Sequence, residues 1–164
     1  MRIYLPSTST ELARLRDDGE LPGPRAASAV TAELEEFYLD PDVEELEYLA
    51  LREATRLSLR MLDADSSAAR RRVVVVAEVP DSAVHPDPVA GRGAVRLLTA
   101  LPLASVVSLH MDGAEAEPAV TAAAAVVLEA DLGSDDAQFV VDEAEAHDLA
   151  WYATQELGPL LELL

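Results

Sequence analysis

The chain has 164 residues, half of them hydrophobic, and a formal net charge of −19. This length and composition predict a single domain with its own core over residues 1–164. The absence of cysteine excludes disulfides, thiolate zinc sites and cysteine nucleophiles. The absence of lysine excludes a Walker phosphate-binding motif and a lysine Schiff base. The acidic charge argues against binding to nucleic acid or anionic membranes, which it repels at long range.

The first third of the chain predicts a strand, a helix, a second strand and a long helix, over residues 1–6, 7–19, 25–34 and 40–65. The first segment alternates loosely and ends in proline, as short strands do. Gly19 is suited to ending the first helix. The long helix has the strongest pattern, with Asp40 at the capping position, Pro41 at the first helical position and apolar residues at a 3.6-residue period.

The remaining residues predict a strand at 70–80, a loop at 81–93, two strands separated by Pro102 within 94–113, helices at 116–133 and 134–158, and an apolar tail at 159–164. The run of valines that follows Arg72 has no polar interruption. Such a run indicates burial on both faces, and therefore a central position in the sheet.

Strands and helices are mixed along the chain without strict alternation. This order favours the α+β class, as a two-layer sandwich of a mostly antiparallel sheet with helices packed on one face. The ferredoxin-like split βαβ arrangement is the nearest common plan. No apolar stretch is long enough for a signal peptide or a bilayer span, which predicts a cytoplasmic protein.

The segment 144–156 carries the only tryptophan of the chain and the largest concentration of chemically versatile side chains. If it is helical, candidate binding residues fall on overlapping faces: His147, Asp148, Trp151, Tyr152 and Gln155. Three interpretations remain open, which are core packing with satisfied polar tips, recognition of a ligand or partner, and acid–base work by His147 with a carboxylate. No nucleophile of a usual kind accompanies the histidine, and no catalytic residue is assigned.

Three arginines, Arg52, Arg56 and Arg60, lie four residues apart on the long helix, and we call them the arginine row. Arginine forms two-pronged contacts with carboxylates and phosphates. The row is therefore expected either to pair with carboxylates of the protein itself or to line a pocket for an anionic ligand. Such a pocket would lie between the row and residues 147–156.

Metal and cofactor sites have little support in the sequence. Glu143 and His147 lie four residues apart, which suits one helical face, but helical di-iron sites need a Glu-x-x-His pair on each of two helices. The second copy is missing and the spacing differs. We therefore expect neither a metal nor a cofactor.

Acidic residues are unevenly distributed. Residues 97–164 contain 13 acidic residues and no arginine. The leading hypothesis is a non-enzymatic interaction or regulatory domain whose acidic surface binds a basic protein partner. The alternative is a protein that binds a small anionic molecule, or an enzyme of unrecognised type. Homodimerisation through the apolar tail or a sheet edge is a third possibility.

Four segments, "MRIYLP" (1–6), "EELEYLAL" (44–51), "RRRVVVVAEVP" (70–80) and "DDAQFVVDEAEAHDLAWYATQE" (135–156), carry a resemblance to a known family. Together they resemble an uncharacterised family of small proteins from high-GC Gram-positive bacteria, a domain of unknown function. The resemblance covers nearly the whole chain. It agrees with the absence of lysine and asparagine, which have AT-rich codons, and it implies no activity and no site residues.

Overall fold

The computed structural model of the protein describes residues 1–164. Its strands are β1 (Arg2–Ser7), β2 (Glu20–Leu21), β3 (Arg25–Ser28), β4 (Val73–Glu78), β5 (Val84–Pro86), β6 (Ala94–Leu97), β7 (Leu101–Pro102), β8 (Val106–Met111) and β9 (Ala150–Ala153). Its helices are α1 (Ser9–Asp18), α2 (Ala32–Phe37), α3 (Val43–Ala64), α4 (Glu117–Asp131), α5 (Asp135–Glu145) and α6 (Leu157–Glu162). The α+β class is confirmed.

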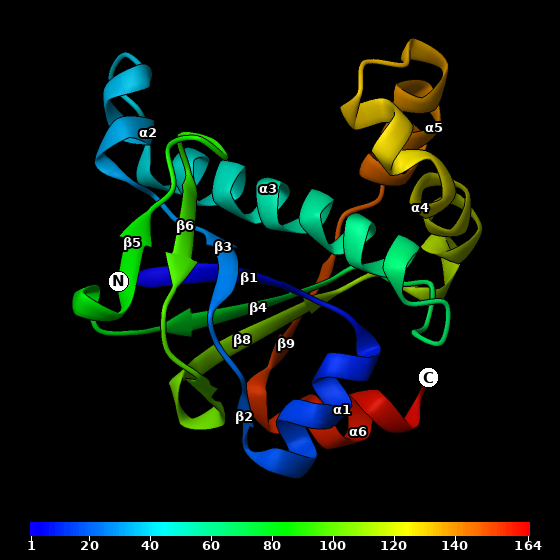
Figure 1. Cartoon of the computed structure of the whole chain (residues 1–164). Helices are drawn as coiled ribbons and strands as arrows, with labels where there is room; N and C mark the ends of the chain where they lie inside the picture. The colour runs from blue at the N-terminus through cyan, green and yellow to red at the C-terminus, as the bar shows by residue number, and fades with distance from the viewer.

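Seven strands form one antiparallel sheet in the order β5-β6-β3-β1-β4-β8-β9, and β2 pairs separately with β7. The valines of β4 are buried on both faces, which confirms the central strand predicted at 70–80. Strand β1 pairs with β3 only at Tyr4 and Ser28, and the sheet turns sharply there, so that β3, β5 and β6 cross the direction of β1 and β4 (Figure 1).

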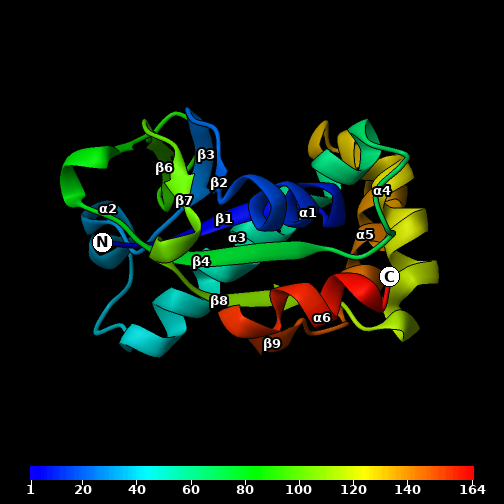
Figure 2. The same cartoon turned by 90° about the horizontal axis from the view of Figure 1, so that it is seen from below.

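Helices cover both faces of this sheet, whereas the sequence led us to expect them on one face (Figures 1 and 2). On one face, Ala50 and Ala54 of α3 pack on Tyr4, Val74 and Val76. On the other, apolar residues of α1 and of the C-terminal tail pack on β1 and β4, namely Leu12, Leu15, Leu157 and Leu160. The second layer exists because a strand that is apolar on both sides needs a cover on each.

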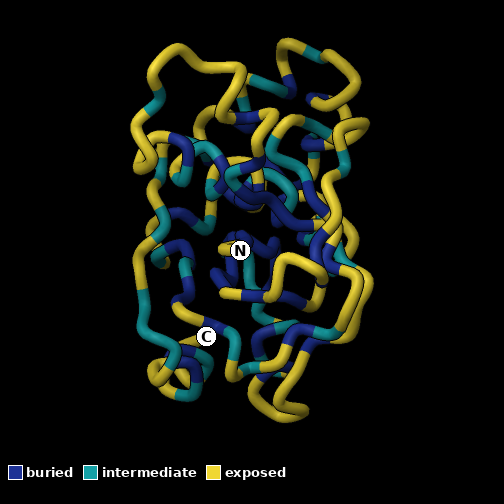
Figure 3. The backbone as a smooth tube through the Cα atoms, turned by 90° about the vertical axis from the view of Figure 1, so that its left-hand side faces the viewer, coloured by how far each residue is buried: buried dark blue, intermediate teal, exposed yellow.

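One split βαβ unit is present, because β3 and β4 are both antiparallel to β1, which lies between them, and α2 and α3 make the connection. Helices α4 and α5 form an antiparallel hairpin beside the C-terminal half of α3 (Figure 1). Val120, Val127 and Val141 of this hairpin are buried with Leu59 and Leu62 of α3. Buried backbone is concentrated in the middle of the molecule (Figure 3).

Local capping explains where the helices begin. Thr8 caps α1, and Gly19 ends it with φ 76°, a left-handed conformation that favours glycine. The cap of α3 is Asp42, whose Oδ1 accepts a hydrogen bond from the Glu44 amide, and not Asp40. Asp40 instead adopts φ 51° at the corner between α2 and α3. Aspartate tolerates this conformation better than most residues.

Several expected elements differ from the structure. Pro102, expected to separate two strands, lies in β7, and most of the expected apolar tail at 159–164 belongs to α6. The strand expected over 25–34 ends at Ser28, because Thr31 caps α2. The loop expected at 81–93 contains β5, which pairs with β6. The helix expected over 134–158 ends at Glu145, and the chain then returns to the sheet as β9, because β8 offers it a hydrogen-bonding edge. No helix in the structure has the length and apolar character needed to cross a membrane.

Candidate functional site

The arginine row faces the α4–α5 hairpin and pairs with its polar groups. Arg56 lies 3.0 Å from Asp131 and 3.2 Å from Glu145, and donates a hydrogen bond of 2.9 Å to Gln138. Arg60 lies 2.6 Å from the second oxygen of Asp131. The interpretation that the row pairs with the protein's own carboxylates therefore describes Arg56 and Arg60. Their main role is to fasten the hairpin to α3.

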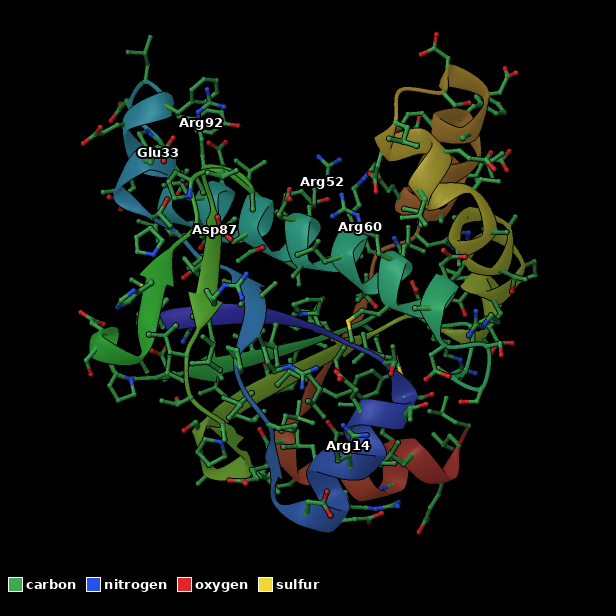
Figure 4. All side chains as sticks on the ribbon, viewed as in Figure 1. Arg14, Glu33, Arg52, Arg60, Asp87 and Arg92 are labelled. Atoms are coloured by element: carbon green, nitrogen blue, oxygen red, sulfur yellow. The ribbon has the colours of Figure 1, made fainter.

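Arg52 is the least constrained member of the row. Its side chain is half exposed and lies 3.6 Å from Glu145. It points away from the sheet, on the open side of α3 (Figure 4). Arg52 and Arg56 share a pocket with residues of α3, the residue before β4, the end of α5 and the α5–β9 connection: Tyr48, Leu51, Thr55, Leu59, Arg72, Glu145, His147, Asp148 and Leu149.

A buried ion pair, which the sequence analysis missed, lies behind this pocket and contributes Arg72 to its lining. Arg72 and Asp112 are 1% and 0% exposed, and the Arg72 Nε and Nη2 donate to the two Asp112 oxygens at 2.8 Å. The Asp112 carboxylate also accepts from the Arg72 amide, and the Arg72 Nη2 donates to the carbonyl of His147. The pair joins β4, the end of β8 and the α5–β9 connection. The only sequence signal was the basic run before the valines.

The structure brings together some of the predicted site residues and separates others. His147 and Asp148 line the pocket with Arg52 and Arg56, but residues 147–156 contain no α-helix, so their expected helical faces do not exist. Trp151 and Tyr152 point to opposite sides of β9, and Tyr152 packs against the larger core. Gln155 is exposed in a short 3-10 turn, and Arg60 lines a different hollow beside Pro6 and Leu57.

Trp151 is 62% exposed on β9, an edge strand of the sheet. We therefore expect the folded protein to show red-shifted Trp151 emission that acrylamide quenches readily. Comparison of emission and quenching before and after urea unfolding checks this, because the spectrum should change little. A blue-shifted emission that resists acrylamide until the protein unfolds would contradict the exposed position of this residue.

Two pKa shifts occur near these residues. Burial lowers the pKa of His110, which lies opposite Trp151 in the β8–β9 pair. Burial alone would raise the pKa of Asp131, but hydrogen bonds from Arg60 and Arg56 outweigh it and the pKa is lowered. Both shifts have a structural cause.

Glu143 and His147 do not share a helical face, because α5 ends between them, and no group of three or more metal-ligating side chains forms.

The strongest concentration of unpaired charge lies around α2 and the start of α3. Residues 33–47 contain eight acidic residues and no basic one: Glu33, Glu35, Glu36, Asp40, Asp42, Glu44, Glu45 and Glu47. Only Glu47 lies within ion-pair distance of an arginine, 3.8 Å from Arg2. We call this set the acidic corner. Arg2 and Arg92 lie beside this corner, and eight carboxylates against two arginines leave its net charge negative.

Exposed apolar side chains lie in the middle of the acidic corner. Leu39 is fully exposed, Val43 is 63% exposed, and the rings of Phe37, Tyr38 and Tyr48 are 54%, 41% and 52% exposed. We call these five residues the corner patch. The Phe37 and Tyr38 rings meet edge to face at 5.0 Å, and the Arg92 guanidinium lies 3.8 Å from the Phe37 ring centre. Clustered exposed aromatic residues are typical of interaction surfaces.

The geometry defines an α+β protein with an internally paired arginine row and an unpaired acidic corner. The chain belongs to the family of unknown function DUF6912, whose sequence profile matches residues 1–161. This confirms the expectation of an uncharacterised family. No curated protein and no solved structure matches the chain.

Proposed function

We propose that this protein is a non-enzymatic binding domain that recognises a basic segment of another protein at the acidic corner. The observation that carries the proposal is the coincidence of the corner patch with acidic residues that have no internal partner. A buried apolar centre within a polar rim is the common anatomy of protein interfaces. Acidic residues around it attract a basic partner and raise its rate of association.

The alternative, a pocket for an anionic ligand beside the arginine row, has weaker support. Arg56 already contacts Asp131, Gln138 and Glu145, and Arg72 is paired with Asp112. Arg52 is the pocket arginine with the weakest internal pairing, 3.6 Å from Glu145, and Glu145 and Asp148 share the lining with it. An anion entering this pocket would meet nearly balanced charges.

Two further expectations from the composition belong to the same proposal. The absence of lysine and asparagine supports a high-GC genome, and the resemblance of the four segments supports an origin in a high-GC Gram-positive bacterium. The lack of a long apolar segment in the sequence supports action in the cytoplasm.

Capture from an extract of the source organism tests the proposal. The double variant Leu39→Ser/Val43→Ser removes the two most exposed aliphatic side chains of the corner patch. The matched control, Leu128→Ser/Leu132→Ser, removes two exposed leucines of the α4–α5 hairpin, which are 53% and 89% exposed. We expect wild type and control to recover the same partner and the corner variant to recover about ten-fold less, as for an interface hot spot.

The partner should also dissociate when the salt concentration rises, because exposed charges are screened. Its segment in contact with the domain should be rich in arginine or lysine. Equal recovery by the corner variant and the control, or a partner that binds through an acidic segment, would contradict the proposal.

A further inference from the structure

A small hollow in the acidic corner combines aromatic, apolar and acidic groups. It lies where α2 meets α3, and six residues line it: Tyr38, Pro41, Glu45, Leu46, Tyr48 and Leu49. Leu46 is buried and forms an apolar base, and the two tyrosine rings are about half exposed. The Glu45 carboxylate has no arginine within ion-pair distance. Two rings and a free carboxylate around one hollow suit a cation better than a neutral or anionic group.

We infer that this hollow is a recognition pocket for one arginine side chain of the basic partner segment. A cation over a tyrosine ring is attracted by the negative face of the ring. The planar guanidinium also stacks on aromatic rings and binds a carboxylate through two hydrogen bonds. Tyr38 and Tyr48 supply the rings and Glu45 supplies the carboxylate. The inference rests on the proposed function, and it names the group by which the partner is held.

The same corner already holds one arginine on an aromatic ring. Arg92, from the β5–β6 loop, lies beside α2 (Figure 4). Its guanidinium is over the Phe37 ring, whose centre is 5.0 Å from that of the Tyr38 ring. Tyr38 lines both the pocket and the neighbouring hollow that Phe37 and Arg92 share, so the pocket adjoins an existing arginine–aromatic contact. Apart from Arg92 the surroundings are acidic, because Asp42 and Glu44 are chain neighbours of the pocket residues Pro41 and Glu45 and no basic residue lies between positions 33 and 47.

Tyrosine-selective NMR with a single-arginine probe tests the inference. The protein has four tyrosines, and the buried Tyr4 serves as an internal reference. Titration with acetyl-arginine-methylamide should shift the ring signals of Tyr38 and Tyr48 and leave that of Tyr4 in place. The citrulline analogue has nearly the same shape without the charge, and should produce no comparable shift.

Variants then identify the groups that bind. Tyr48→Ala and Glu45→Gln should each lower the affinity of the protein for the arginine probe about three- to ten-fold, the range expected for one cation–π contact or ion pair. The matched variant Glu129→Gln removes one exposed charge of α4, outside the acidic corner, and should retain wild-type affinity within about two-fold. Amide spectra establish that each variant is folded.

The inference is overturned if the arginine probe leaves Tyr38 and Tyr48 unshifted, if citrulline acts equally, or if Tyr48→Ala and Glu45→Gln bind as wild type does. Neither Leu39 nor Val43 lines the pocket. The Leu39→Ser/Val43→Ser variant could fail to capture the partner while the arginine titration shifts neither tyrosine signal. That result would rule out the arginine pocket and still support the proposed function. Equal capture by all variants would remove the proposed function instead.

Discussion

The Asp112→Asn variant is expected to lose about 3–5 kcal/mol of unfolding free energy, the usual cost of breaking a buried ion pair from one side. Asp112 and Arg72 are almost completely buried and share two hydrogen bonds of 2.8 Å. The change leaves the Arg72 guanidinium buried without a counter-charge. Because that guanidinium also holds the His147 carbonyl, the start of β9 should loosen as well. Urea unfolding followed by circular dichroism measures the loss.

Two companion variants make this result specific. Asp136→Asn removes a carboxylate from the exposed first turn of α5, and its unfolding midpoint should stay close to that of wild type. The double variant Arg72→Met/Asp112→Leu removes both charges, and should be more stable than Asp112→Asn. A loss below about 1 kcal/mol for Asp112→Asn would show that the pair does not tie β4, β8 and β9 together.

Replacement of Arg56 by alanine should cost about 1.5–3 kcal/mol, the range for hydrogen bonds to charged groups. Arg56 binds Asp131, Glu145 and Gln138, so it contacts both helices of the hairpin. Its loss should undock the hairpin from α3 before the sheet unfolds. Urea unfolding measures the loss, and faster amide hydrogen exchange in α4 and α5 than in β4 reports the undocking.

Arg52→Ala is the matched control for Arg56→Ala, because Arg52 is on the same helix but is half exposed and 3.6 Å from its nearest carboxylate. It should change stability by less than about 1 kcal/mol. The arginines lower the pKa of Asp131 below its ordinary value of 3.8, so their contribution is present above that pH and is lost as the pH falls below it. The stability difference between wild type and Arg56→Ala should therefore shrink in acid. A difference that grows in acid would contradict the assignment.

Segments with a strong local pattern were predicted correctly from the sequence. The valine run gave the central strand β4, and the apolar period of residues 40–65 gave α3 with an error of three residues at its start. The predicted end of the helix at 134–158 was wrong, because residues 147–156 have no strand pattern of their own. Residues 150–153 form β9 by pairing with β8, in which Met111 lies opposite Ala150 and Ser108 lies opposite Ala153, 39 and 45 positions apart along the chain. Pairing over such separations is decided by tertiary structure.

The candidate site was also predictable only where a local pattern in the sequence marks it. The spacing of Arg52, Arg56 and Arg60 revealed a row, and pairing with the protein's own carboxylates was one of the two stated outcomes. The sequence could not show that Arg72 meets Asp112, because the two lie 40 residues apart. Nor could it show that Tyr38 and Tyr48 stay exposed, since aromatic residues in an amphipathic pattern are usually buried.

Site-specific photo-crosslinking from position 39 tests the central claim most directly. A photoreactive amino acid placed at Leu39, in the corner patch, should capture a protein segment rich in arginine and lysine, and the yield should fall at high salt. The same group placed at Leu132, equally exposed on the α4–α5 hairpin, provides the comparison. Enrichment of one basic segment at position 39 alone is the predicted result. Equal products at both positions, or crosslinks to acidic segments, would show that the acidic corner is not a binding surface for a basic partner.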